Sequence, residues 1–198
     1  MILDYLNFKN IVYVFSLIVV STTDHCSTCS RVSQNWRSLI CSLPRLWIHL
    51  DLAAATRPVS VVTVTNYIKR SRKRIARATL QGWAAQSAIL KCIATRCNAL
   101  AHLEILGGFT STLLVEAAPA LQNLNFLRIG ADTSLDAVSQ LLSLCGSLEH
   151  AHFLSVTAKH SVKWTGDLSK LVSLSIDAKM KDPDQRSSLL QLVSLLLE

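Results

Sequence analysis

Histidine and cysteine are the residue types in this chain that could bind a metal, and several of them lie near its start. His25, Cys26 and Cys29 follow one another at zinc-like spacing, with Cys41 and His49 further on. A structural zinc site normally takes four ligands in two close pairs, whereas Cys41 and His49 are eight residues apart. We therefore expect packed thiols, with no metal and no cofactor.

Motifs that organise common catalytic sites are absent from the sequence. It lacks the Gly-x-Ser-x-Gly turn of serine hydrolases, a glycine-rich phosphate loop and the His-Glu-x-x-His pair of zinc peptidases. The 13 acidic residues are scattered, and Asp182-Pro183-Asp184 is typical of a turn. We expect a protein that is not an enzyme and has no catalytic residues.

Composition indicates a folded chain in a reducing compartment. Half of the 198 residues are hydrophobic and 17% are charged, with a mean hydropathy of +0.34. Disordered chains combine low hydrophobicity with high charge, so disorder is excluded. The six cysteines are too dispersed for a small disulfide framework, which favours a cytoplasmic or nuclear protein.

A basic run covers residues 69–77, in a chain whose formal net charge is +7. Such a charge favours acidic partners and polyanions, and the run could be a nuclear localisation signal or a nucleic-acid-binding module. It also fits the solvated side of a helix that turns Tyr67, Ile68 and Ile75 inward. We favour the solvated helix, and the absence of aromatic residues interleaved with the charges argues against contact with nucleic acid.

A comb of four apolar residues, at positions i, i+3, i+6 and i+8, recurs in the second half of the chain. Its four copies are Cys97, Leu100, Leu103 and Ile105; Leu121, Leu124, Leu127 and Ile129; Cys145, Leu148, Ala151 and Phe153; and Leu168, Leu171, Leu174 and Ile176. The four residues of a comb are called its teeth below, and the third teeth of successive copies lie 24, 24 and 23 residues apart. The last two teeth are two residues apart, so they share one face of a strand.

Helical stretches separate the combs, and weaker combs precede them. The helices are predicted over Ser87 to Arg96, Thr112 to Ala118 and Leu135 to Leu144. The weaker combs are Ile75, Ala78 and Leu80, and further upstream Ile40, Leu43, Leu46 and Ile48. A unit of one strand and one helix cannot bury its apolar side alone, so neighbouring units must stack.

This pattern resembles the leucine-rich repeat, L-x-x-L-x-L, and Cys97 and Cys145 resemble its cysteine-containing subtype. The resemblance implies an α/β fold over residues 43–198, a solenoid with one strand and one helix per repeat of about 24 residues. The alternative is an ordinary α/β domain with coincidental leucine spacing. Residues Leu189 to Glu198 carry no polar cap, so we expect an array that is truncated at its C-terminus.

Residues between the teeth are predicted to lie on the opposite face of each strand. In a curved solenoid that face is the extended surface used for binding, although every strand has an outward side whatever its function. The predicted partner-binding residues are Arg77, Thr79, His102, Glu104, Phe126, Arg128, His150, His152, Ser173, Ser175 and Asp177.

Residues 1–42 resemble an F-box. The resemblance lies in Val32-Ser-Gln-Asn-Trp36-Arg, followed by Leu43-Pro-Arg-Leu-Trp47, and in residues 2–9. Fungal F-box and leucine-rich-repeat proteins are the most similar. Membership implies a helical segment that docks on the Skp-type adaptor of a Skp–cullin–F-box ubiquitin ligase, while the repeats present an unknown protein substrate. The matched apolar positions are Ile2, Leu3, Leu6, Val32 and Trp36.

Residues 11–23 interrupt this F-box-like segment, whose opening Leu-Pro is also absent. Removing them restores nearly the family spacing, so we interpret them as an insertion. Their apolar part, residues 11–20, is too short to span a bilayer, and we expect no membrane partner. The alternatives are a genuine core element, or a signal peptide cleaved near Ser21. The signal peptide would make the chain a secreted leucine-rich-repeat protein with no ubiquitin role.

Overall fold

The computed structural model describes residues 47–53, 59–71, 73–82, 87–107, 110–157, 162, 164, 168–179 and 190. The F-box-like segment, residues 1–42, and the insertion at residues 11–23 lie outside this part of the chain. The five predicted adaptor contacts lie outside it as well. They are Ile2, Leu3, Leu6, Val32 and Trp36.

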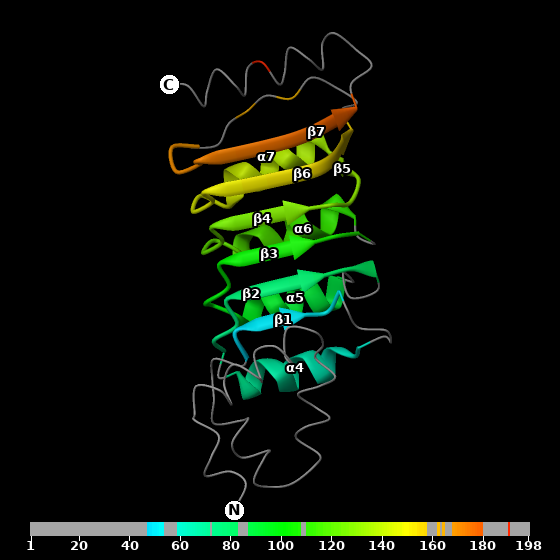
Figure 1. Cartoon of the computed structure of the whole chain (residues 1–198), viewed down its shortest axis with the longest axis vertical. Helices are drawn as coiled ribbons and strands as arrows, with labels where there is room; N and C mark the ends of the chain where they lie inside the picture. Colours follow the sequence, from blue (N-terminus) through cyan, green and yellow to red (C-terminus); the bar gives the residue numbers. More distant parts are fainter. Residues whose placement is uncertain are drawn as a thin grey trace, which may run out of the picture.

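The fold is α/β, and its described strands form one parallel sheet of seven strands (Figure 1). Strands β1 (His49–Asp51), β2 (Arg77–Leu80), β3 (His102–Ile105), β4 (Phe126–Ile129), β6 (His150–Thr157) and β7 (Ser173–Lys179) pair in that order. The short strand β5 (Thr133–Ser134) pairs with the end of β6. Each strand therefore lies beside its predecessor in the repeat, as stacking of the units predicts.

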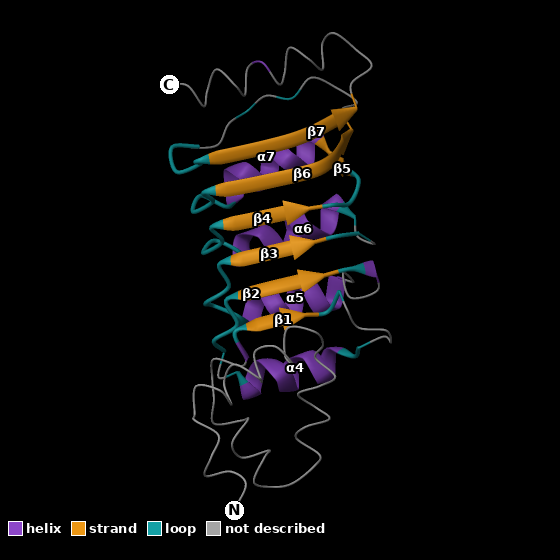
Figure 2. Cartoon of the chain, viewed as in Figure 1, coloured by secondary structure: helices purple, strands orange, loops and turns teal. Residues whose placement is uncertain are grey.

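The helices between the strands lie on one side of the sheet (Figure 2). They are α4 (Val61–Arg70), α5 (Ser87–Arg96), α6 (Ser111–Ala117), which continues into the short 3-10 helix η4 (Ala118–Ala120), and α7 (Leu135–Leu144). Serine hydroxyls cap two of them, since Ser60 and Ser134 accept hydrogen bonds from the N–H groups of Thr63 and Ala137. The predicted helices over residues 87–96 and 135–144 are confirmed. The helix predicted over residues 112–118 begins and ends one residue earlier than expected.

The combs form the core between the sheet and the helices. All teeth of the first three combs are buried, with Leu103, Ile105, Leu124 and Phe153 fully inaccessible to solvent. The fourth comb is only partly buried. Its strand, β7, pairs on one side with β6 and has no neighbour among the described strands on the other, so its side chains are covered less completely.

The prediction for the first strand was wrong by four residues, since its last two buried teeth are Leu50 and Leu52 rather than Leu46 and Ile48. Ile48, expected as its last buried tooth, is 38% exposed, whereas Leu50 and Leu52 are 1% and 2% exposed. Leu50 pairs with Ala78 of β2 and is therefore the third tooth of this comb. Trp47, three residues before it and 1% exposed, is the second tooth. Apolar residues at 46, 48, 50 and 52 alternate without a break, so pairing with β2 decides which of them are covered by the helices.

The basic run is helical only at its beginning. Helix α4 ends at Arg70, where the Ser71 hydroxyl donates to the carbonyl of Ile68 at 2.7 Å. Lys73 then adopts a positive φ of 61°, which ends the helical path. Ile68 faces the core from the helix as predicted, but Ile75 is buried in the connection to β2, so the helix expected to carry both residues is too long.

Candidate functional site

The strand face, the side of the sheet opposite the helices, presents two rows of side chains in register. The first row is His49, Arg77, His102, Phe126, His150 and Ser173. The second row is Asp51, Thr79, Glu104, Arg128, His152 and Ser175. Neighbours within a row lie on adjacent strands, about 4.8 Å apart. Ten of the eleven predicted binding residues fall in these rows.

Three residues of the strand face differ from the sequence prediction. Asp177 lies on β7 at the register shift with β6, between the paired residues Ile176 and Ala178, so it belongs to neither row. His49 and Asp51 were missed because the first strand was misplaced by four residues. Their alternation with the buried Leu50 and Leu52 could have identified them, since the pairs at 50–52, 78–80 and 103–105 are alike in spacing.

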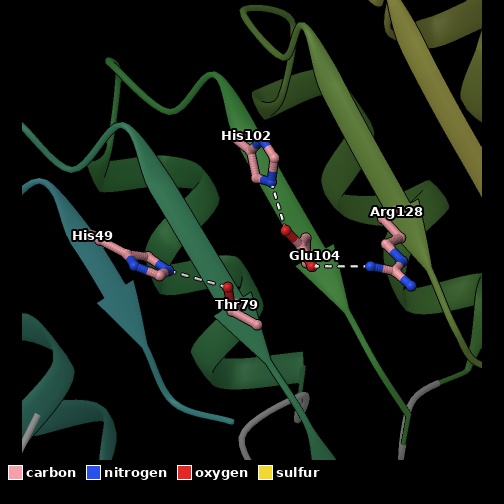
Figure 3. A network of polar contacts seen from close by, with 5 residues as sticks. All are labelled: His49, Thr79, His102, Glu104 and Arg128. Carbon is pink, nitrogen blue, oxygen red and sulfur yellow. Dashed lines mark hydrogen bonds and ion pairs between the residues drawn. The ribbon is translucent and has the colours of Figure 1, made fainter. Parts of the chain in front are cut away.

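A polar network lies at the centre of the second row (Figure 3). Nε2 of His102 lies 2.7 Å from Oε1 of Glu104, and Nη1 of Arg128 lies 3.8 Å from Oε2 of the same carboxylate. Because an ionised carboxylate only accepts hydrogen bonds, Nε2 of His102 carries the proton and donates it. Glu104 thus joins its own strand to β4, and its charge is shared by two basic side chains.

A cluster of four rings occupies the middle of the strand face: His102, Phe126, His150 and His152, called the histidine–phenylalanine cluster below. His102 is stacked on Phe126, with ring centroids 3.9 Å apart and an angle of 2° between the planes. The rings of His152 and His150 are tilted against Phe126, with centroids at 5.4 and 6.4 Å. All four residues are half-buried. The cluster is therefore a preorganised patch of aromatic surface.

The β1 end of the strand face is supported by helix α4. The Tyr67 hydroxyl donates to the carbonyl oxygen of His49 at 3.0 Å, and its ring meets Trp47 edge-on at 4.9 Å. The His49 imidazole forms a hydrogen bond of 3.1 Å with the Thr79 hydroxyl. Burial lowers the pKa of His49, and the nearby carboxylate of Asp51 opposes that shift only in part. His49 is thus favoured in its neutral form.

Neither a metal centre nor a reactive thiol is found in the described part of the chain. Its histidine, cysteine and acidic side chains form no group of three that could hold a metal ion, and three cysteines of the zinc-like pattern lie outside it. Cys92, Cys97 and Cys145 are free and buried. Burial raises the pKa of Cys97 to about 12 and that of Cys145 to about 11, so these two thiols stay protonated at neutral pH.

Comparison with known proteins gives the strand face no relative from which a role could be transferred. No protein-family model matches the chain, and no curated protein matches it. Among the described helices, none is long and apolar enough to cross a membrane. The function is therefore argued from the side chains of the strand face and from the sequence resemblance.

Proposed function

We propose that this protein is a non-enzymatic substrate-recognition adaptor that resembles the F-box subunits of Skp–cullin–F-box ubiquitin ligases. In this proposal the strand face binds the protein substrate and the F-box-like segment binds the Skp-type adaptor. The proposed binding of a protein substrate is supported by the strand face itself. Six strands present their side chains there in two rows, while the helices occupy the other side of the sheet.

The chemistry of the strand face suits a protein partner. Aromatic residues and arginine contribute most often to binding energy at protein interfaces, and the strand face combines Phe126 with Arg77 and Arg128. Half-buried rings lose little conformational freedom on binding, because their neighbours already fix them. These features favour recognition of a surface or an extended segment.

The repeat supports a leucine-rich-repeat solenoid. Units of one strand and one helix follow one another at intervals of 24 residues from Leu103 to Leu127 and from Leu127 to Ala151, and these three residues occupy equivalent positions in register. All three are buried. The same register extends to Leu174 on β7, as stacked repeats require.

The ubiquitin role is supported by the sequence resemblance of residues 1–42. In that resemblance the matched apolar residues Ile2, Leu3, Leu6, Val32 and Trp36 would contact the Skp-type adaptor. A tryptophan anchor typically carries a large share of the energy of an interface. Trp36 is therefore the residue at which the role is best tested.

Binding of the purified full-length chain to a purified Skp-type adaptor tests the proposed function. We expect the wild type to form a complex on size exclusion, Trp36→Ala to abolish it, and Phe126→Ala, on the strand face, to leave it intact. Circular dichroism and the urea midpoint establish that both variants are folded. If the folded wild type forms no complex, or if Trp36→Ala binds equally well, the ubiquitin role is wrong.

A further inference from the structure

We propose that the histidine–phenylalanine cluster recognises a carboxylate-rich segment of the protein partner and binds it more tightly as the pH falls from about 7.5 to about 5.5. This inference rests on the proposed function in one respect, that the strand face binds a protein. It adds the chemistry of the bound segment and a regulation by pH.

Two of the cluster histidines have ring nitrogens available to a partner. His150 and His152 contact Phe126 through their rings, and their ring nitrogens form no hydrogen bond or ion pair with any described residue. They lie two residues apart on β6, so both point to the strand face. A neutral imidazole offers one N–H donor and an imidazolium offers two. Both forms suit a carboxylate, and the charged form suits it better.

The carboxylate that adjoins the cluster, that of Glu104, already has basic partners, which are His102 and Arg128. Asp51 lies on β1, which is separated from β3 by β2, and Asp177 lies on β7 at the register shift, two residues beyond Ser175, the partner of His152. Of the carboxylates on the described strand face, the one that adjoins the cluster is therefore already balanced by basic side chains.

Protonation reverses the formal charge of the strand face. Its described side chains include two arginines, Arg77 and Arg128, and three carboxylates, those of Asp51, Glu104 and Asp177, which together give −1. Protonation of the three cluster histidines changes this value to +2. Histidine is the side chain whose charge changes closest to physiological pH. His49, the remaining titratable group, is favoured in its neutral form by burial.

A carboxylate fits this pH range better than a phosphate ester. Aspartate and glutamate have pKa values of about 4 in model peptides, so they remain ionised at pH 5.5. A phosphate ester has its second pKa near 6, so it loses negative charge over the range in which histidine gains positive charge. Acidification therefore strengthens attraction to a carboxylate-rich segment throughout this range.

The test uses the full-length protein and a fluorescein-labelled peptide, (Ser-Glu)₃-Leu-(Glu-Ser)₃, with binding followed by fluorescence anisotropy in the presence of a chelator. We expect the dissociation constant to fall at least about tenfold between pH 7.5 and pH 5.5. A matched peptide with glutamine in place of glutamate should bind weakly at both pH values. Since only the carboxylates differ between the two peptides, this comparison isolates the charge of the ligand.

Variants assign the pH dependence to the cluster. The double variant His150→Gln/His152→Gln should reduce the pH effect to less than about threefold, and the single variant His152→Gln should reduce it partially. Lys91→Gln, which removes an exposed positive charge from helix α5 on the other side of the sheet, is the control and should leave it unchanged. Urea midpoints at both pH values establish that each variant is folded, and if the double variant is unfolded the single variant decides.

Three results would overturn the inference: equal affinity of the wild type for the glutamate peptide at both pH values, equal binding of the glutamine peptide, or an undiminished pH effect in a folded cluster variant. The proposed function fails by a different result, the absence of a complex with the Skp-type adaptor. That measurement depends on Trp36, whereas the one cluster variant in it, Phe126→Ala, is expected to leave the complex intact. The two failures are therefore distinguishable.

Discussion

The imidazole of His102 lies flat on the phenyl ring of Phe126, with ring centroids 3.9 Å apart. The two residues are direct partners on adjacent strands, so the stack follows from the register of β3 and β4. The same imidazole donates to Glu104, whose carboxylate also meets Arg128 on β4. Two independent contacts thus fix the ring of His102, and they join the two strands on the face that we propose binds a partner.

The phase of β4 is tested by two neighbouring residues. Leu127 is 1% exposed, so Leu127→Ala should lower the free energy of unfolding by about 2–5 kcal/mol. Arg128 is exposed, and its ion pair among the described residues is long, at 3.8 Å, so Arg128→Ala should change the free energy of unfolding by less than about 0.5 kcal/mol. Urea unfolding measures both. A larger cost at Arg128 would mean that the two faces of the strand are exchanged.

The corrected position of the first strand makes a similar prediction. Trp47 is 1% exposed and packs edge-on against Tyr67, so Trp47→Ala should lower the free energy of unfolding by about 3–5 kcal/mol. Ile48→Ala should cost less than about 1 kcal/mol, because Ile48 is 38% exposed. Thermal or urea unfolding of the full chain distinguishes the two. Equal costs would contradict the burial of Trp47.

The lowered pKa of His49 makes stability depend on pH. Burial holds this pKa below its usual value of about 6.5, so between the two values the unfolded chain binds a proton that the folded chain does not. The contribution of His49 is therefore complete above about pH 6.5 and is lost as the pH falls through that window. We expect His49→Gln to lose less stability than the wild type between about pH 7 and pH 5.

Urea midpoints across this range measure the effect, with His152→Gln as the control from the same face of the sheet. An identical pH slope for the wild type and His49→Gln would show that His49 takes up its proton equally well in the folded and unfolded chains.

The buried thiols should resist alkylation in the folded protein. With pKa values of about 12 for Cys97 and about 11 for Cys145, fewer than about one thiol in a thousand is ionised at pH 8. We expect iodoacetamide to leave both residues largely unmodified in buffer and to modify both in urea, as read by peptide mass spectrometry. Rapid modification of Cys97 without denaturant would contradict its burial.

Sequence patterns predicted the α/β fold and most of its buried residues well, and the details of the site less well. The spacing of the combs fixed both the buried teeth and the side chains of the strand face from β2 to β7, because a period of two within a strand leaves no other phase once the teeth are known. The β1 strand was misplaced because its apolar residues alternate over a longer stretch. The helix predicted over the basic run extends past the observed end of α4, because a run of charges does not indicate that the helix ends at Ser71 and Lys73.

Contacts between side chains of the strand face lay beyond sequence reasoning. Aligned combs place His102 beside Phe126, and Glu104 beside Arg128. The stacking of the rings and the direction of the Glu104 carboxylate depend on side-chain torsions, which spacing does not specify. The cluster could therefore be predicted as a set of neighbours, but not as a stack with His150 and His152 left free to bind.

Site-specific photo-crosslinking tests most directly the claim that the strand face recognises a substrate for ubiquitination. A benzophenone amino acid would replace Phe126 on the strand face, or, as the control, the exposed Gln140 of helix α7, in cells that make the protein. We predict that one protein crosslinks at position 126 and not at position 140, and that its level rises when the chain is depleted. A protein that crosslinks equally at both positions, or whose level is unchanged by depletion, would contradict the account.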